Sequence, residues 1–275
     1  MPPTLRCAMS RRAVLLALAL ATTSALQRLH VVGETSRWVV VDKPSGVPCH
    51  ASDKGDGVLT LLRRDAVERG EREAAVAEYR LVHRLDDGTS GCLAIAKDKE
   101  TATLLGAAFR ERRARKAYVG LTDKTPKKKQ GVVAGDLVKA RRGAFKLART
   151  RTAGACAVTA ITRTAGLGAA AAGDAARKLL VARPVTGKTH QIRVAAKSLG
   201  APLLGDDLYG GAPADRLYLH AAALAIDDAG LDVSTPPRSG ASFLSARFTA
   251  AWASLDWAAE LADDRVPRSA RSLLP

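Results

Sequence analysis

The strongest chemical signal in the chain is a short charged segment, which reads His83-Arg84-Leu85-Asp86-Asp87-Gly88-Thr89-Ser90-Gly91. The apolar run from Cys92 to Ala96 follows it directly and predicts a buried strand. Asp86 is therefore expected in a rigid loop at a sheet edge. His83 and Asp86 could form two-thirds of a hydrolase triad, but no suitable nucleophile accompanies them. For this segment alone, a plain turn remains the alternative, because Asp, Gly, Thr and Ser all favour turns.

Two other segments resemble chemical motifs and fail on their spacing. Thr186-Gly187-Lys188-Thr189 follows a strand-like run and suggests a phosphate-binding loop, but that motif needs a glycine where Ala182 stands. Gly88-Thr89-Ser90-Gly91 suggests the nucleophile turn of a hydrolase, but that motif needs a glycine where Cys92 stands. We therefore reject both interpretations.

The elements that must position these residues are strands more often than helices. Helical patterns cover Leu59 to Val76, Asp98 to Arg115 and Gln191 to Leu199. Strand patterns cover Trp38 to Val41, Gly91 to Ala96, Tyr118 to Leu121, Ala155 to Thr162, Lys178 to Ala182 and His220 to Ile226, with polar hairpins over 123–151 and an Ala/Gly-rich loop over 165–176. Because strands and helices do not alternate regularly, the sequence favours an α+β fold.

Composition indicates a globular protein with an anionic partner. The 275 residues are 47% hydrophobic and 25% charged, and the net charge is +16. Fifteen Lys or Arg and three acids lie in residues 110–151, which predicts contact with a phosphate backbone. No apolar run reaches the roughly 20 residues of a membrane helix, so we expect no membrane span. The four cysteines show no zinc-site spacing, so we expect no metal.

The N-terminal 30 residues resemble a cleavable targeting segment. Arg11 and Arg12 precede an apolar run from Ala13 to Ala21, and the first acid of the chain is Glu34. We expect a mitochondrial or plastid presequence, while a secretory signal or a short core helix remains open. The sequence thus divides into a targeting segment (1–30), a catalytic domain (35–260) and a flexible tail (261–275).

Five motifs, taken in their order along the chain, resemble those of one enzyme family. They are His83-Arg84-Leu85-Asp86 with Thr89-Ser90-Gly91, then Lys116-Ala117-Tyr118, then Thr186-Gly187-Lys188-Thr189-His190-Gln191-Ile192-Arg193, then Gly205-Asp206-Asp207-Leu208-Tyr209-Gly210, then Leu219-His220-Ala221. In this order they closely resemble the RluA-type family of RNA pseudouridine synthases, and Lys43-Pro44-Ser45-Gly46 resembles the family's opening motif. The resemblance extends from about residue 35 to about residue 255.

The resemblance implies a pseudouridine synthase fold: a long, mixed, mainly antiparallel sheet flanked by helices and loops, with a central catalytic cleft. Asp86 would be the catalytic nucleophile that breaks the glycosidic bond of a uridine. Arg193 would be its basic partner, since a nearby guanidinium favours a charged carboxylate. Tyr118 would stack on the uracil and could take its C5 proton, and Arg84 would fill the gap left by the flipped base.

The remaining motif residues are implied to bind substrate: His83, Lys116, Thr189, His190 and Gln191. We expect the two histidines to orient loops through hydrogen bonds. The chemistry implies no cofactor, because nothing is oxidised or transferred from a donor. The expected partner is RNA, either ribosomal or transfer RNA, and we expect a monomer. One departure stands out, because the family commonly has histidine where this chain has Ala195.

Two other functions stay open at this point. The first is a catalytically silent RNA-binding protein or RNA chaperone on the same scaffold. Intact Asp86, Tyr118 and Arg193 argue against it, because a chaperone need not keep all three. The second is a hydrolase or nucleotide triphosphatase, which the failed motif spacings disfavour.

Overall fold

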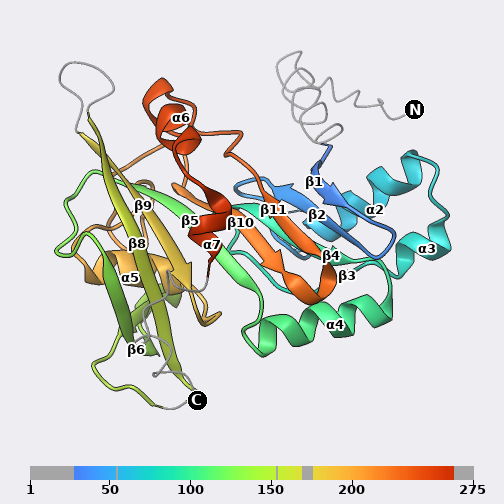
Figure 1. The fold of residues 1–275 in the computed structure, drawn as a ribbon, viewed down its shortest axis with the longest axis horizontal. Helices are drawn as coiled ribbons and strands as arrows, with labels where there is room; N and C mark the ends of the chain where they lie inside the picture. The colour runs from blue at the N-terminus through green and yellow to red at the C-terminus, as the bar shows by residue number, and fades with distance from the viewer. Residues whose placement is uncertain (1–27, 54, 153, 169–175, 263–275) are drawn as a thin grey trace, which may run out of the picture.

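The chain is built around one long mixed sheet, which Figure 1 shows running across the computed structural model. The structure describes residues 28–53, 55–152, 154–168 and 176–262. Along the sheet the described strands follow the order β1 (His30–Glu34), β2 (Trp38–Lys43), β4 (Ser90–Ala96), β10 (Leu219–Ile226), β5 (Arg115–Thr122), β9 (Arg177–Pro184), β8 (Cys156–Gly168), β6 (Gly131–Lys139) and β7 (Phe145–Leu147). Two further strands join this path: β3 (Arg80–Leu81) pairs with β4, and β11 (Leu231–Ser234) pairs with β10.

Strand pairing confirms the predicted α+β class with a mixed, mainly antiparallel sheet. Among the described strands, β4 and β10 form the only parallel pair, with Ser90 opposite His220 and Gly91 opposite Ala221. This pair begins at the residues that follow the Asp86 loop. The loop therefore lies beside the start of β10, close to the centre of the sheet.

Short helices surround the sheet, and two of them cover opposite faces of the same strands. The helices are α2 (Val58–Glu68), α3 (Glu73–Ala77), α4 (Lys99–Arg110), α5 (Gln191–Ser198), α6 (Ala246–Ala253) and α7 (Trp257–Leu261), with single 3-10 turns η1 (Arg141–Gly143) and η2 (Asp227–Ala229). Leu93 and Ile95 of β4 pack in a cluster with α2, while Cys92 and Ala94 pack in another with α4. Since alternate residues of a strand face opposite ways, both faces of β4 are buried.

Two predicted helices are shorter than expected. The pattern over 59–76 predicted one helix, but the structure breaks it into α2 and α3 at Gly70, whose φ of +93° suits glycine and reverses the chain. The pattern over 98–115 predicted a second helix, which ends at Arg110 before a left-handed residue, Arg112. Periodic apolar residues were therefore a poor guide to helix ends.

Strand β8 is longer than expected. The strand was predicted over 155–162, with a loop from residue 165, but β8 continues to Gly168 and pairs with β9. Pairing with a neighbouring strand outweighs the weak strand preference of its Ala and Gly residues. The hairpin prediction over 123–151 is confirmed in β6 and β7, where Leu137 lies opposite Leu147.

The predicted terminal segments lie almost wholly outside the described residues. This holds for most of the targeting segment (1–30) and for the tail (261–275). The described chain ends slightly inside the predicted tail, where Leu261 is buried at the end of α7. Within the described residues, no helix combines the length and hydropathy that crossing a membrane would need.

Acid sensitivity is one testable consequence of this packing. His220 is fully buried, bonded to Ser90 Oγ (2.8 Å) and the Thr235 carbonyl (2.8 Å), and burial lowers its pKa to about 3. The unfolded chain takes up this proton near pH 6.5, so the histidine contributes stability above that pH and loses it as pH falls toward 3. By itself, this histidine should contribute about a tenfold loss in the folding equilibrium per pH unit in that window.

The measurement is urea unfolding between pH 7 and 5, comparing wild type with His220→Asn. Asp42, whose pKa burial raises to about 6, acts in the opposite direction, so the difference between the two proteins is the quantity to follow. The variant starts less stable but loses less stability on acidification. An exposed control, His50→Asn, keeps the wild-type slope. Equal slopes in all three proteins would contradict this prediction.

Candidate active site

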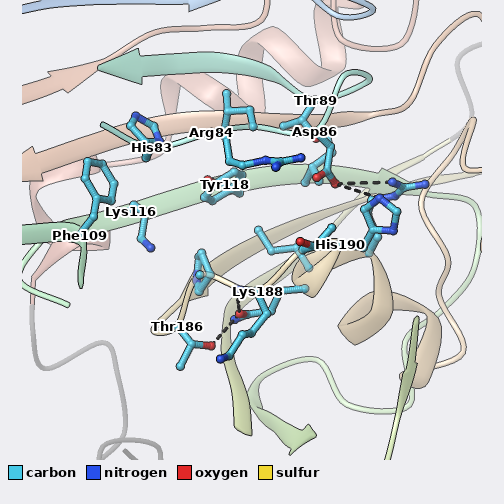
Figure 2. A pocket seen from close by; sticks show the side chains of 18 of the residues that line it. His83, Arg84, Asp86, Thr89, Phe109, Lys116, Tyr118, Thr186, Lys188 and His190 are labelled. Carbon is cyan, nitrogen blue, oxygen red and sulfur yellow. Dashed lines mark hydrogen bonds and ion pairs between the residues drawn. The ribbon is translucent and has the colours of Figure 1, made fainter. Parts of the chain in front are cut away.

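A cavity of about 410 Å³ opens where the sequence motifs meet. It is lined by every one of the predicted site residues: His83, Arg84, Asp86, Lys116, Tyr118, Thr189, His190, Gln191 and Arg193. Figure 2 shows side chains from the Asp86 loop, strand β5 and the start of α5 converging on this space. Segments that are over 100 residues apart in sequence therefore meet at one site.

A buried lysine, Lys43, binds the backbone of the Asp86 loop. Lys43 is fully buried, and its ammonium donates to the carbonyls of Pro44 (2.9 Å), Val47 (2.5 Å) and Asp87 (2.9 Å). Burial lowers the pKa of this lysine to about 8. Ser45 adds a bond from its hydroxyl to the Gly88 carbonyl (2.7 Å). The opening motif thus fixes the backbone on which Asp86 stands, a role that sequence reasoning missed.

Arg193 connects Asp86 to a second, buried carboxylate. Its Nε and Nη2 donate to the two oxygens of Asp206 at 2.8 and 2.7 Å, and its Nη1 lies 3.5 Å from Asp86 Oδ2. The Asp206 side chain is fully buried, whereas 21% of the Asp86 side chain is exposed. Burial alone lowers the pKa of Arg193, but the two carboxylates outweigh it and raise that pKa. The guanidinium therefore stays charged beside Asp86.

His190 and Tyr209 complete the surroundings of Asp86. His190 adopts a left-handed backbone (φ +56°) at the start of α5, with its Nε2 3.9 Å from Asp86 Oδ2. Its Nδ1 forms a hydrogen bond with the Tyr209 hydroxyl (3.0 Å), which also accepts the Phe145 N–H (3.0 Å). The Tyr209 ring lies under Arg193, 5.0 Å from the guanidinium carbon. The sequence showed Asp206 and Tyr209 only as members of the fourth motif. Their spacing from Arg193 did not predict that both would contact its guanidinium.

Gln191 shapes the loop before α5 through its side-chain amide. Its Oε1 accepts from Thr186 Oγ1 (2.6 Å) and Lys188 N (3.0 Å), and its Nε2 donates to Val158 O (2.9 Å) and Thr159 Oγ1 (3.0 Å). These four bonds engage the whole amide. These bonds position the loop before α5, the predicted substrate contact of Gln191 stays a prediction, and the neighbouring Thr189 is exposed at the cavity.

The other end of the cavity is formed by His83, Phe109 and Lys116, with Tyr118 between this end and Asp86 (Figure 2). His83 accepts the Ala94 N–H (2.9 Å) and stacks on Phe109 with centroids 4.2 Å apart, and burial lowers its pKa to about 3. Burial also raises the pKa of Tyr118, so its hydroxyl remains protonated, and lowers the pKa of Lys116 to about 8. Phe109 lies within the helical pattern predicted over 98–115 and was not predicted as a site residue.

Ala195 stands where the family commonly has histidine, and it is buried within α5. Its side chain is 2% exposed and its carbonyl accepts from Ser198 Oγ (2.7 Å). A methyl group fills this position without leaving a polar atom unpaired. The departure therefore lies in the buried packing of α5, because Ala195 is not among the residues that line the cavity.

Comparison with known proteins now defines the class. A family model described as RNA pseudouridylate synthase matches residues 37–198, which places the chain among the enzymes that isomerise uridine in RNA. The chain belongs to this RNA pseudouridylate synthase family, and its motifs are those of the RluA type. It is an RNA pseudouridine synthase.

Individual relatives agree with this assignment. An uncharacterised RNA pseudouridine synthase of Haemophilus influenzae is 38% identical over 72% of this chain and 82% of its own length. RNA pseudouridine synthase 2, chloroplastic, of Oryza sativa subsp. japonica is 34% identical over 61% of this chain and 38% of its own. Among solved structures, human RNA pseudouridylate synthase domain containing 1 has a TM-score of 0.60 and 26% identity, covering 78% of this chain and 86% of that one.

Proposed function

We propose that the protein converts specific uridines of ribosomal or transfer RNA into pseudouridine, with Asp86 as the nucleophile. One observation carries the proposal: the Asp86 carboxylate faces the cavity and lies 3.5 Å from an arginine that buried Asp206 holds in place. A charged guanidinium favours the ionised carboxylate, which is the form that can attack carbon. Residues 35–260 would form the catalytic domain.

The reaction balances without an oxidant or a group donor. Asp86 attacks the sugar and displaces the base, so the C1′–N1 bond breaks. The uracil turns in the cavity, C5 bonds to C1′ as Asp86 leaves, the C5 proton is lost and N1 takes up a proton. Because its hydroxyl stays protonated, Tyr118 is better suited to stack on the uracil than to accept the C5 proton as a phenolate.

The target uridine must leave its stack to reach the cavity, at a cost of roughly a few kcal/mol. Arg84 is exposed at the cavity rim and can occupy the space that the base leaves. Thr189 and His190 line the cavity and would contact the flipped nucleotide. His83 Nε2 and the Gln191 amide are bonded to the protein itself, so both residues also position the lining of the cavity.

The test is tritium release from transfer and ribosomal RNA transcripts labelled with [5-³H]uridine, because only bond formation at C5 frees that tritium. Release from one transcript class identifies the substrate, and sequencing of the product locates the site. Tight RNA binding without release from either class would instead support a catalytically silent RNA-binding protein.

We infer further that the protein works in a mitochondrion or a plastid, as a monomer. The acid-free, arginine-containing residues 1–30 support import, and the similar rice protein is named as chloroplastic. Residues 1–30 fused to a fluorescent protein should enter one of these organelles, and secretion of the fusion would contradict the inference. Light scattering measures the molar mass of the purified protein in solution and so tests whether it is a monomer.

Basic residues of the β6–β7 hairpin should supply RNA affinity beside the site. Phe145 of this hairpin packs edge-on against His190, with 5.8 Å between the two ring centroids. The neighbouring exposed residues Arg141, Arg142 and Lys146 would therefore lie beside the cavity. Replacing these three by glutamine should weaken RNA binding and reduce the salt slope of log affinity by about 2. The measurement is RNA binding by fluorescence anisotropy between 50 and 300 mM salt, roughly the range where such slopes are resolved.

A control with equal charge loss comes from the loop between β5 and β6. Its exposed Lys127, Lys128 and Lys129 lie near the opposite end of α5, where the Lys127 N–H bonds to the Leu199 carbonyl (2.9 Å). The triple glutamine variant of this loop should change the slope less than the hairpin variant. Equal effects of the two triple variants would show that only total charge matters.

A further inference from the structure

The cavity has two ends with different chemistry, and Tyr118 lies between them (Figure 2). Asp86, Arg193 and His190 form one end, where the bond changes would occur. Lys116 precedes Tyr118 by two residues on β5 and lies at the other end of the cavity. Because side chains two apart on a strand share a face, Lys116 extends from the same face as Tyr118, about 7 Å farther along.

The Lys116 end is cationic and has no acid to balance it. Among the described residues that line the cavity, Asp86 is the only acidic side chain. Arg193 is already engaged by Asp206 and Asp86. By contrast, no described residue forms an ion pair or a side-chain hydrogen bond with Lys116 or with Arg110 at the end of α4. The Lys116 ammonium lies 5.8 Å from the Phe109 ring centroid, in a half-buried position that costs it hydration.

The side-chain donors at this end do not match a uracil edge. The imide edge of uracil presents two carbonyl acceptors and one N–H donor, so it needs an acceptor as well as donors. His83 offers none, because its Nε2 already accepts the Ala94 N–H and its neutral ring must then carry the proton on Nδ1. Lys116 and Arg110 can only donate. A phosphate oxygen, which is an acceptor with negative charge, fits this set.

We propose that Lys116, with Arg110 and His83, binds the phosphodiester group next to the target uridine. The proposal rests on the function proposed above and names a subsite of the same cavity. With the sugar at Asp86 and the uracil on Tyr118, a backbone phosphate that lies along the edge of the base would meet the Lys116 ammonium. Lys116 would then hold the nucleotide in place after it leaves the stack, so its loss raises KM more than it lowers kcat.

The test measures binding of small probes, which does not depend on turnover. Uridine, uridine 3′-monophosphate and uridine 5′-monophosphate are titrated into the full-length protein by calorimetry or NMR. One of the two monophosphates should bind wild type about tenfold more tightly than uridine. The gain should disappear in Lys116→Gln and survive in Lys116→Arg, which keeps a positive charge at the same place. Which monophosphate shows the gain identifies the 3′ or the 5′ side.

Controls separate this subsite from the general positive charge and from misfolding. Lys99→Gln removes one charge from the exposed start of α4, outside the cavity, and should keep the wild-type preference. Thermal unfolding and unchanged uridine binding show that Lys116→Gln is folded. The proposal is overturned if wild type binds neither monophosphate more tightly than uridine, or if the preference survives in Lys116→Gln.

Activity is read separately, so failure of the subsite and failure of the function can be told apart. Tritium release without a phosphate preference would overturn the subsite and leave the isomerase. A phosphate preference lost only in Lys116→Gln, without tritium release from any RNA, would keep the subsite and remove the proposed catalytic role. In active protein, the same substitution should raise KM for RNA while kcat stays within about threefold of wild type.

Discussion

Replacement of Asp86 by asparagine is expected to abolish tritium release from labelled RNA, with a fall in kcat of at least about 1,000-fold. The amide keeps the size of the carboxylate but cannot attack C1′. RNA affinity should stay within about threefold of wild type, or rise slightly, because one negative charge leaves a cationic cavity. Single-turnover tritium release and anisotropy of the same transcript measure the two quantities side by side.

The adjacent carboxylate provides a matched control for this prediction. Asp87 contributes its backbone carbonyl to Lys43, and that bond is unaffected by a change in its side chain. We expect Asp87→Asn to retain at least about a tenth of the wild-type kcat, so that the large loss belongs to one carboxylate of the pair. Substantial turnover by Asp86→Asn would show that Asp86 is not the nucleophile.

Substitution of Arg193 by glutamine should give the second large effect, on both stability and turnover. Asp206 is fully buried and its two oxygens are held by Arg193, so the variant leaves a buried carboxylate without its cation. Breaking a buried pair in this way costs about 3–5 kcal/mol of folding stability. Turnover should fall at least about 100-fold, because Asp86 also loses its charged neighbour. Urea unfolding and tritium release measure these effects.

Two further variants show whether geometry or charge carries the effect. Arg193→Lys keeps the charge but cannot form two parallel bonds to Asp206, so its stability should fall between those of wild type and Arg193→Gln. Lys197→Gln removes a charge from the exposed side of α5 and should change neither quantity. Wild-type stability in Arg193→Gln would mean that Asp206 finds another partner.

The sequence was informative about the cavity because its polar motifs are local and ordered. Asp86, Tyr118 and Arg193 could each be placed from a few adjacent letters, and all three line the cavity. Lys43 and Asp206 could not be assigned roles in this way. The three carbonyls around Lys43 and the pairing of Asp206 with Arg193 depend on how separate segments fold together. Sequence patterns therefore identified residues that line the cavity better than the buried groups that orient them.

Element boundaries were harder to predict for a similar reason. The helix break at Gly70 depends on one positive φ angle inside an otherwise helical pattern. The extra length of β8 depends on its partner β9, because the Ala and Gly residues of that segment have little strand preference of their own. Local preference decided the class of these elements, and tertiary pairing decided where they end.

The three carbonyls bound by Lys43 also set a condition for transplanting this chemistry into another scaffold. The Lys43 ammonium binds the carbonyl of Asp87, 44 residues away in sequence. The conformation of the Asp86 loop therefore depends on the segment that contains Lys43. A designer who moved only residues 83–91 would lose the cation that fixes their backbone. Residues 43–47 would have to be grafted with them, together with enough surrounding apolar volume to keep water from the ammonium. The smallest portable unit of this site is therefore two segments and their shared buried charge.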